Sequence, residues 1–245
     1  MRLKGILSLG IFAVLIGCSA QVKEQVTEKY PNGKKKTVIT YEGLKSNIIK
    51  KEMYFPDGKL QSVQHMKEGE PDSLTLIYYK SGSKYRETNY KMGKKHGKDI
   101  SWYENGQVQS EAEYVDGVPA GKIVTYFEDG KVQSEVTYKN GKKEGEEVHY
   151  MPDGSKKKLI TYRDGKRNGL FKKWYDNGNP EQEEMYQDDV RDGPYALYHE
   201  NGKKSEEGTY VQGKLHGKRY GYSETGRKIS EVNYENGEQM GGRAY

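Results

Sequence analysis

Histidines are the side chains in this sequence with the clearest potential for acid–base or metal chemistry. His96 and His216 occupy the same place in a glycine-bracketed loop, but other loops carry Glu144 and Asn168 there, so no ligand set repeats. No Ser, His and Asp spacing indicates nucleophilic catalysis, and no glycine-rich loop precedes a helix to hold phosphate. The sequence therefore predicts no metal site, no cofactor and no enzyme activity. The five histidines are His65, His96, His149, His199 and His216.

Glutamates recur with a fixed spacing that could create a line of negative charge. On a stack of hairpins they would lie about 9.6 Å apart, which is two strand spacings. One interpretation is an acidic stripe for a basic partner or for Ca²⁺. The other, which we favour because surface charges usually serve solubility, is a solvated row paired with loop lysines Lys94, Lys142, Lys166 and Lys214. The glutamates are Glu87, Glu111, Glu135, Glu183, Glu207 and Glu231.

Aromatic residues recur in a second register. If exposed, they would form a binding stripe suited to sugar rings or to an extended peptide. Packing across a curled sheet is an equally good interpretation, because a thin sheet can use both faces. The residues of this possible stripe are Tyr79, Tyr103, Phe127 and Tyr175.

The chain opens with a basic pair, Arg2 and Lys4, followed by the apolar run Ile6–Ile16. The run is too short to span a bilayer as a helix, which takes about twenty residues, and it is typical of a signal peptide. Loss of the basic pair on cleavage lowers the formal net charge from +5 to +3. A balance this close to neutral gives no reason to expect a nucleic-acid partner.

The segment Leu15-Ile16-Gly17-Cys18 resembles a bacterial lipobox, and Cys18 is the only cysteine in the chain. The resemblance implies cleavage after a signal peptide of residues 1–17 and lipidation of Cys18. Several acyl chains on one residue would anchor the protein stably to a membrane. By resemblance to the sorting rule of diderm bacteria, Ser19 favours the outer membrane of the bacterial cell envelope. Residues 18–29 are polar and predict a tether.

Residues 30–245 consist of copies of one repeated unit. This repeat must position the histidines, glutamates and aromatic residues described above. Glycines recur almost always at 24-residue steps, a period typical of repeat architectures. A tyrosine follows nearly every one of these glycines after eight residues. A second glycine follows six of them after fifteen residues. The repeated glycines are Gly33, Gly58, Gly82, Gly106, Gly130, Gly154, Gly178, Gly202 and Gly226.

Within each unit the side chains alternate with period two, which indicates strands. Along residues 131–138, Val132, Val136 and Tyr138 share one face. Asn or Asp precedes most of the repeated glycines, and such pairs are typical of type I′ hairpin turns. The other turn is expected in a longer loop such as 139–145. The sequence predicts an all-β, elongated antiparallel meander, or solenoid, of about nine 24-residue hairpins.

The composition agrees with a thin sheet. With 22 tyrosines and 30 glycines but only 33% hydrophobic residues, the chain excludes a large α/β enzyme and a helical bundle. Tyrosine suits a thin sheet because it buries its ring and keeps the hydroxyl in water.

Four segments carry a family resemblance. They are Tyr138-Lys-Asn-Gly141-Lys-Lys-Glu-Gly145 and its counterparts at 90–97, 162–169 and 210–217. They resemble the Tyr-x-x-Gly-x-x-x-Gly half of the MORN repeat, in its shorter bacterial variant. Chains of this kind are often labelled YwqK-type antitoxins.

Three function classes follow. The first is a non-catalytic, lipid-anchored scaffold that binds a protein partner. The second, implied by the resemblance, is an antitoxin-type neutraliser of a toxin. The third is a module that binds cell-wall polysaccharide, with a glycan as partner.

Overall fold

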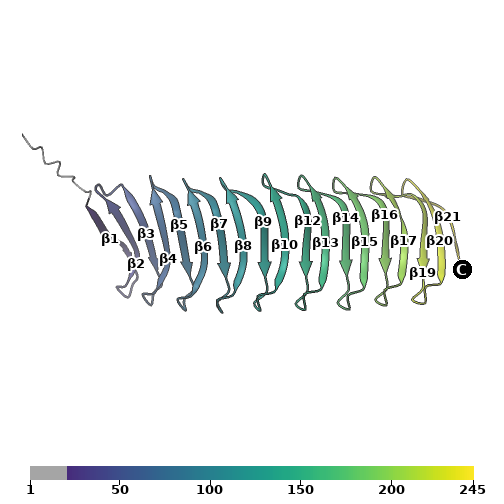
Figure 1. Ribbon diagram of the computed structural model, residues 1–245, viewed down its shortest axis with the longest axis horizontal. Helices are drawn as coiled ribbons and strands as arrows, with labels where there is room; N and C mark the ends of the chain where they lie inside the picture. The colour runs from purple at the N-terminus through teal and green to yellow at the C-terminus, as the bar shows by residue number, and fades with distance from the viewer. Residues whose placement is uncertain (1–20) are drawn as a thin grey trace, which may run out of the picture.

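The computed structural model describes residues 21–245 as a single open antiparallel sheet (Figure 1). Apart from the two ends of the sheet and the two-residue strands, each strand pairs with its neighbours in the sequence, so the chain runs as a meander along one axis. The described residues contain no helix. The predicted all-β, elongated, antiparallel hairpin array is confirmed. Residues 1–17, which are predicted to be a signal peptide, and Cys18 lie outside the described residues.

The sheet contains 21 strands, of which the two-residue strands β11 and β18 continue into β12 and β19 after a one-residue interruption. Their bounds are β1 Val22–Lys29, β2 Lys35–Glu42, β3 Ile48–Tyr54, β4 Leu60–Lys67, β5 Glu70–Tyr78, β6 Lys84–Lys91, β7 Lys94–Trp102, β8 Val108–Val115, β9 Val118–Tyr126, β10 Val132–Lys139, β11 Lys142–Lys143, β12 Gly145–Tyr150, β13 Lys156–Arg163, β14 Lys166–Trp174, β15 Pro180–Gln187, β16 Val190–Tyr198, β17 Lys204–Val211, β18 Lys214–Leu215, β19 Gly217–Tyr222, β20 Lys228–Glu235 and β21 Glu238–Ala244.

The turn that contains the repeated Asn-Gly or Asp-Gly pair is not type I′. At Tyr103–Gln107, Gly106 N–H donates to the Tyr103 carbonyl and Tyr103 N–H donates to the Gln107 carbonyl. Only Gly106 has a positive φ, which describes a type I turn closed by a glycine bulge. The asparagine is favoured for another reason: Asn105 Oδ1 accepts from Gln107 N–H, and its Nδ2 donates to the Glu128 carbonyl of the next unit.

The type I′ turns lie at the opposite edge of the sheet, where a longer loop was expected. Asn140 and Gly141 have φ values of 52° and 76°, and Lys139 pairs with Lys142 across them. Met92 and Gln212 take the same left-handed conformation before a glycine. The type I′ turn was therefore predicted at the wrong edge of the sheet, because the Asn-Gly signature does not distinguish a type I′ turn from a type I turn with an asparagine-capped bulge.

Residues 22–29 also differ from the expectation. They were predicted as part of a tether, yet they form strand β1, which pairs with β2. The physical reason is the turn at Tyr30–Lys34, which has the same hydrogen bonds as the later turns and folds β1 back onto the sheet. Side chains of β1 are all exposed, so main-chain hydrogen bonds rather than burial hold it there.

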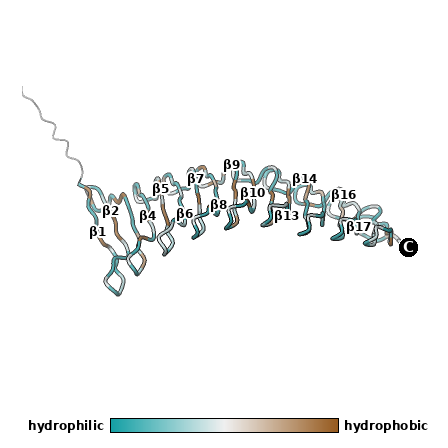
Figure 2. The backbone as a smooth tube through the Cα atoms, turned by 60° about the horizontal axis from the view of Figure 1, so that its bottom comes forward, coloured by the Kyte–Doolittle hydropathy of each residue, from teal (hydrophilic) through white to brown (hydrophobic). Residues whose placement is uncertain are grey.

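The sheet has two faces with different side chains. Face A is defined here as the side that carries Thr88, Asp99, Ser101 and Ser134, and face B as the side that carries Ile100 and the repeated glutamates. Figure 2 shows apolar residues on the strands and polar residues at the turns. No large side chain among the described residues is completely buried. The core is therefore shallow, and its buried apolar side chains lie in β2 and between β12 and β16.

Candidate functional site

The repeated glutamates lie on face B, where five of the six pair with a lysine and Glu111 accepts from a tyrosine hydroxyl. Glu183 accepts from Lys172 Nζ at 2.5 Å and from the Tyr198 hydroxyl at 3.1 Å. Glu135 has the same arrangement with Lys122 and Tyr150, whereas Glu207 accepts from Tyr222 and pairs with Lys204 of its own strand. Glu111 accepts from the Tyr126 hydroxyl, Glu87 pairs with Lys84, and Glu231 pairs with Lys218.

These contacts change the titration of both partners. Burial would raise the pKa of Glu183, but the hydrogen bonds from Lys172 and Tyr198 outweigh it and lower the pKa. Burial and the hydrogen bond to Glu183 raise the pKa of Tyr198 to about 12. The lysines that pair with the repeated glutamates lie within strands and not at the loops. They are not the expected partners Lys94, Lys142, Lys166 and Lys214. The acidic row is thus part of a repeating Lys–Glu–Tyr contact.

The predicted aromatic stripe has an internal structural role. The Tyr79 hydroxyl donates to the Trp102 carbonyl at 2.8 Å, and the Tyr103 hydroxyl donates to the Tyr126 carbonyl at 2.7 Å. The Tyr175 hydroxyl likewise donates to the Tyr198 carbonyl, so each tyrosine reaches the next strand pair. Phe127 occupies the same position in its unit but has no hydroxyl. The four rings are half-buried. They connect each unit to the next, and binding of a ligand by this stripe stays a prediction.

The histidines are dispersed through the array. His149 Nε2 lies 2.9 Å from Glu147 Oε1, His96 Nδ1 lies 3.3 Å from Asp116 Oδ1, and His199 lies against the Tyr222 carbonyl. Across residues 21–245, no three His, Cys, Asp or Glu side chains are grouped so that they could hold a metal ion. Nor does this part of the chain include any helix of the length and apolarity needed to cross a membrane.

Sequence reasoning missed a buried ionic cluster on face A. Asp99 is 3% exposed and accepts from Arg86 Nε at 2.7 Å and from Thr88 Oγ1 at 2.9 Å, while Lys95 Nζ lies 2.5 Å away. Burial would raise the pKa of Asp99, but the hydrogen bonds from Arg86, Lys95 and Thr88 lower it to about 2. The sequence signal for this cluster was weak, because the position of Asp99 in the repeat is occupied by Ile123 and Phe171 in other units.

A second cluster on face A surrounds Glu184, which is also 3% exposed. It accepts from the Tyr186 hydroxyl at 2.7 Å and from Gln182 Nε2 at 2.8 Å, and Arg191 lies 3.1 Å away. The Arg191 guanidinium also lies over the ring of Tyr210. Buried charges in a single-layer sheet are therefore covered by the long side chains of neighbouring strands.

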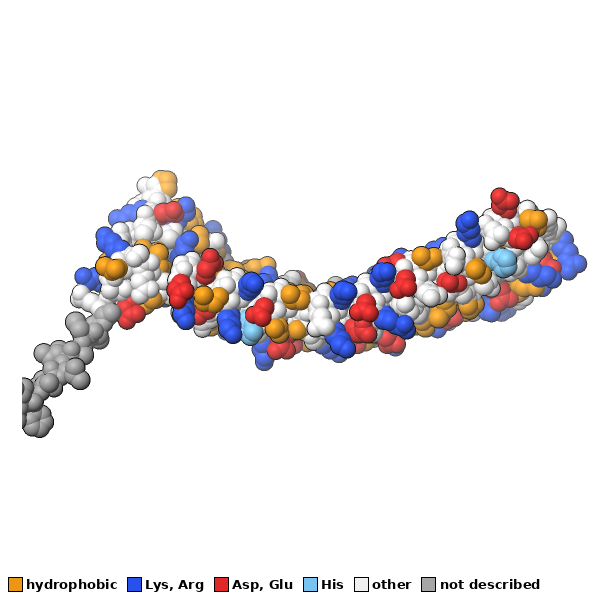
Figure 3. Space-filling model, turned by 90° about the horizontal axis from the view of Figure 1, so that it is seen from above, with side chains coloured by type: hydrophobic (Ala, Val, Ile, Leu, Met, Phe, Trp, Pro, Cys, Tyr) orange, Lys and Arg blue, Asp and Glu red, His pale blue; other side chains and the backbone are white. Residues whose placement is uncertain are grey.

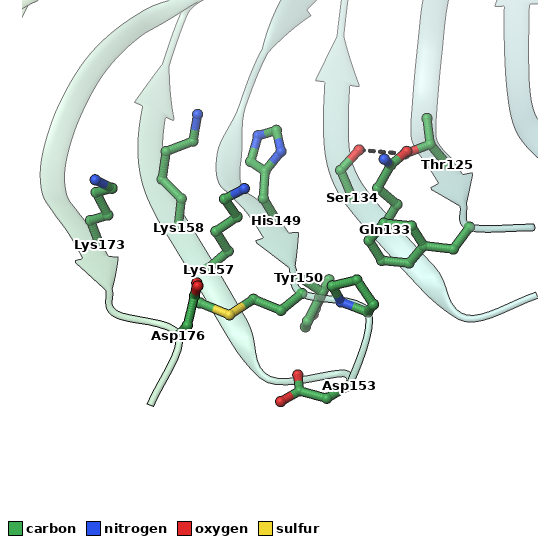
Figure 4. A pocket seen from close by; sticks show the side chains of 13 residues that line it. Thr125, Gln133, Ser134, His149, Tyr150, Asp153, Lys157, Lys158, Lys173 and Asp176 are labelled. Atoms are coloured by element: carbon green, nitrogen blue, oxygen red, sulfur yellow. Dashed lines mark hydrogen bonds between the residues drawn. The ribbon is translucent and has the colours of Figure 1, made fainter. Parts of the chain in front are cut away.

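A hollow with a volume of about 1060 Å³ lies on face A between β9 and β14 (Figure 4). His149, Lys158 and Lys173 project into it from three adjacent strands. Phe127 and Met151 supply apolar surface, and Asp153 and Asp176 lie near the turns. This is the strongest candidate for a functional site, and of its lining only His149 and Phe127 were candidate residues in the sequence.

Comparison with known proteins assigns the repeat type. Five segments match the family described as "MORN repeat variant", at residues 95–116, 120–140, 167–188, 191–212 and 215–236. Residues 141–166, which lie between matched segments, are outside the match although they form the same hairpin. No curated protein matches the sequence.

Solved structures with some likeness include three large assemblies or pores. The crystal structure of TcdB2-TccC3-Cdc42 is 14% identical, with 82% of this chain and 14% of that chain covered and a TM-score of 0.19. A porin-like protein from Bacteroides uniformis is 11% identical, with 89% and 91% covered and a TM-score of 0.20. The Photorhabdus luminescens Tc holotoxin pore is 10% identical, with 87% and 17% covered and a TM-score of 0.18.

The chain thus spans a small part of two of these three structures, and scores at this level support no inference about it. The repeat match and the observed sheet agree with each other, since the matched segments coincide with successive hairpins. Five segments of this protein thus match the MORN repeat variant, within a β-hairpin array that extends over residues 21–245.

Proposed function

We propose that this protein is a non-catalytic scaffold, anchored by a lipid on Cys18 in the bacterial cell envelope, which binds a protein partner along its sheet. The observation that carries the proposal is the open single-layer sheet of 21 strands, which leaves both faces accessible along its length. Extended repeat surfaces of this kind are suited to binding other macromolecules.

The distribution of charge supports a binding surface. Figure 3 shows basic and acidic side chains intermixed along the whole bowed body, with no large region of one sign. Such a surface neither attracts nucleic acid by long-range charge nor repels other proteins. Specific binding then depends on local sites such as the hollow beside His149.

The anchor is proposed from the sequence around Cys18, which resembles a lipobox, and Ser19 favours the outer membrane. Metabolic labelling with palmitate tests it. We expect label on the wild-type protein and none on Cys18→Ser. Label that persists in Cys18→Ser would defeat the anchor without affecting the scaffold.

Partner binding is tested by photo-crosslinking in the intact envelope. A photoreactive residue at Gln133, which lines the hollow, is expected to capture a defined protein, whereas the same residue at the exposed turn position Lys139 is not. The captured protein is then purified and titrated against the purified scaffold. Absence of direct binding, or equal capture at both positions, contradicts the proposal. A captured toxin that loses activity in the complex would assign the antitoxin role.

A further inference from the structure

We propose that the hollow on face A binds an acidic segment of the protein partner, with His149, Lys158 and Lys173 facing its carboxylates. The inference rests on the proposed function, because it takes the occupant to be a protein. It goes further by naming the site, the chemistry of the bound segment and its orientation.

The three side chains are direct neighbours across the sheet. His149 pairs with Lys158, and Lys158 pairs with Lys173, in one row across β12, β13 and β14. The same row contains hydroxyl groups in the preceding units, where Ser101 bonds Ser110 and Thr125 bonds Ser134 at 2.7 Å. The row therefore changes from neutral hydroxyls to basic groups at the strands that border the hollow.

Folding alone does not explain the basic groups. Like charges on directly opposite residues of neighbouring strands are destabilising. Lys173 has a partner in Glu181 at 2.6 Å, and His149 has one in Glu147. Within residues 21–245, no carboxylate lies within ion-pair distance of Lys158, in contrast to the neutralised glutamates of face B. Lys158 is therefore the basic group of this row that lacks an anionic partner.

The rest of the lining specifies the ligand further. Met151 is buried and, with Phe127 and Pro152, adds apolar surface beside the basic row. Asp153 and Asp176 lie toward the turns, away from the amino groups of Lys158 and Lys173 (Figure 4). A bound segment would therefore place carboxylates over the basic row and an apolar side chain over Met151.

The size of the hollow admits a peptide segment. Its volume of about 1060 Å³ is at the upper limit of the roughly 300–1,000 Å³ that is typical of small-ligand pockets. Anionic polysaccharide would satisfy the lysines but would leave the Met151 and Phe127 surface without an apolar partner. The mixed lining thus favours an acidic peptide with interspersed apolar residues.

Direct titration tests the site independently of the partner's identity. The full-length protein is titrated into a fluorescein-labelled peptide, Gly-Glu-Phe-Glu-Leu-Glu-Gly, and anisotropy is measured at low salt. We expect saturable binding that weakens about tenfold in Lys158→Gln and more in Lys158→Gln/Lys173→Gln. The control Lys142→Gln removes the same charge from an exposed turn outside the hollow, and its affinity is expected to equal that of the wild type.

Stability provides the second measurement. Lys158→Gln relieves the repulsion from Lys173, so its thermal midpoint is expected to equal or exceed that of the wild type, and lost binding then cannot come from unfolding. Equal affinity in wild type and double variant, or equal binding of a peptide with Lys in place of Glu, overturns the proposal. So does binding of oligogalacturonate without binding of the peptide. These outcomes leave crosslinked capture of a partner unaffected, so the two proposals fail separately.

Discussion

The two faces of this sheet are built on the same repeat but use it differently. On face B the tyrosine fifteen residues further along donates its hydroxyl to Glu135, Glu183 and Glu207 in the same way, and a lysine pairs with each of these glutamates. On face A the corresponding rows change from unit to unit, from the ionic cluster at Asp99 to the hydroxyls at Ser134 and the basic row at Lys158. Regular chemistry therefore identifies the structural contacts, and departures from it identify the candidates for binding.

The faces also differ in how much each contact contributes. The glutamates of face B are partly exposed, and ion pairs of this kind contribute little to stability. Asp99 on face A is almost completely buried, where a charge without its partners is strongly unfavourable. Removal of the Asp99 contacts on face A should accordingly lower the stability of the protein more than removal of a glutamate contact on face B.

Asp99→Ala is expected to have the largest effect of the variants considered. It leaves the partly exposed Arg86 and Lys95 without their shared carboxylate, and the lowered pKa of Asp99 sets the expected loss at about 2 kcal/mol. Amide hydrogen exchange of β6 and β7 measures the local free energy of opening. Glu104→Gln, at an exposed turn, is the control. Equal exchange in the two variants would show that the two faces do not differ as described.

Acid should remove much of the same contribution in the wild type. The pKa of Asp99 is lowered from 3.8 to about 2 in the folded chain, so the stabilisation is complete above about pH 4 and is lost as the pH falls toward 2. The shift corresponds to about 2 kcal/mol. Urea unfolding of wild type and Asp99→Asn between pH 5 and pH 2 measures it. The difference between the two proteins should shrink on acidification, and a constant difference would contradict the assignment.

Tyr103→Phe tests the contacts that connect successive units. The variant loses the hydroxyl that donates to the Tyr126 carbonyl, a hydrogen bond that contributes about 1 kcal/mol. Phe127→Tyr is the matched reverse variant, because it adds a hydroxyl in the same register. Urea unfolding should show opposite shifts of similar size. Unchanged stability in both would mean that this stripe is free for another role, such as ligand binding.

Glu183→Gln is expected to have the smallest effect on stability, below about 1 kcal/mol, because the pair with Lys172 is partly exposed. Its clearer consequence is electrostatic. The pKa of Tyr198, raised to about 12 by burial and by Glu183, should move down toward its ordinary value of 10.0. NMR titration of ¹³C-labelled tyrosine measures this change. A Tyr198 pKa that stays at about 12 would assign the whole shift to burial.

Much of the architecture was predictable from local patterns. The 24-residue spacing of glycines and tyrosines and the period-two alternation indicated an antiparallel hairpin array, and the structure confirms it. These signals are readable because every unit repeats the same backbone geometry. The type I′ turn was predicted at the wrong edge of the sheet, since Asn105-Gly106 and Asn140-Gly141 have the same residues but different φ at the asparagine. Strand β1 was missed because its residues are polar and exposed.

The sequence alone determined the repeat, the strand alternation and the rows of glutamate and aromatic residues, because those features depend on neighbours in one unit. Only the tertiary structure decided which groups meet across units. Asp99 joins Arg86 and Lys95, Tyr103 reaches the next strand pair, and His149, Lys158 and Lys173 form one row. The register between strands and the bulges set these contacts, and a one-residue shift would move every side chain to the other face.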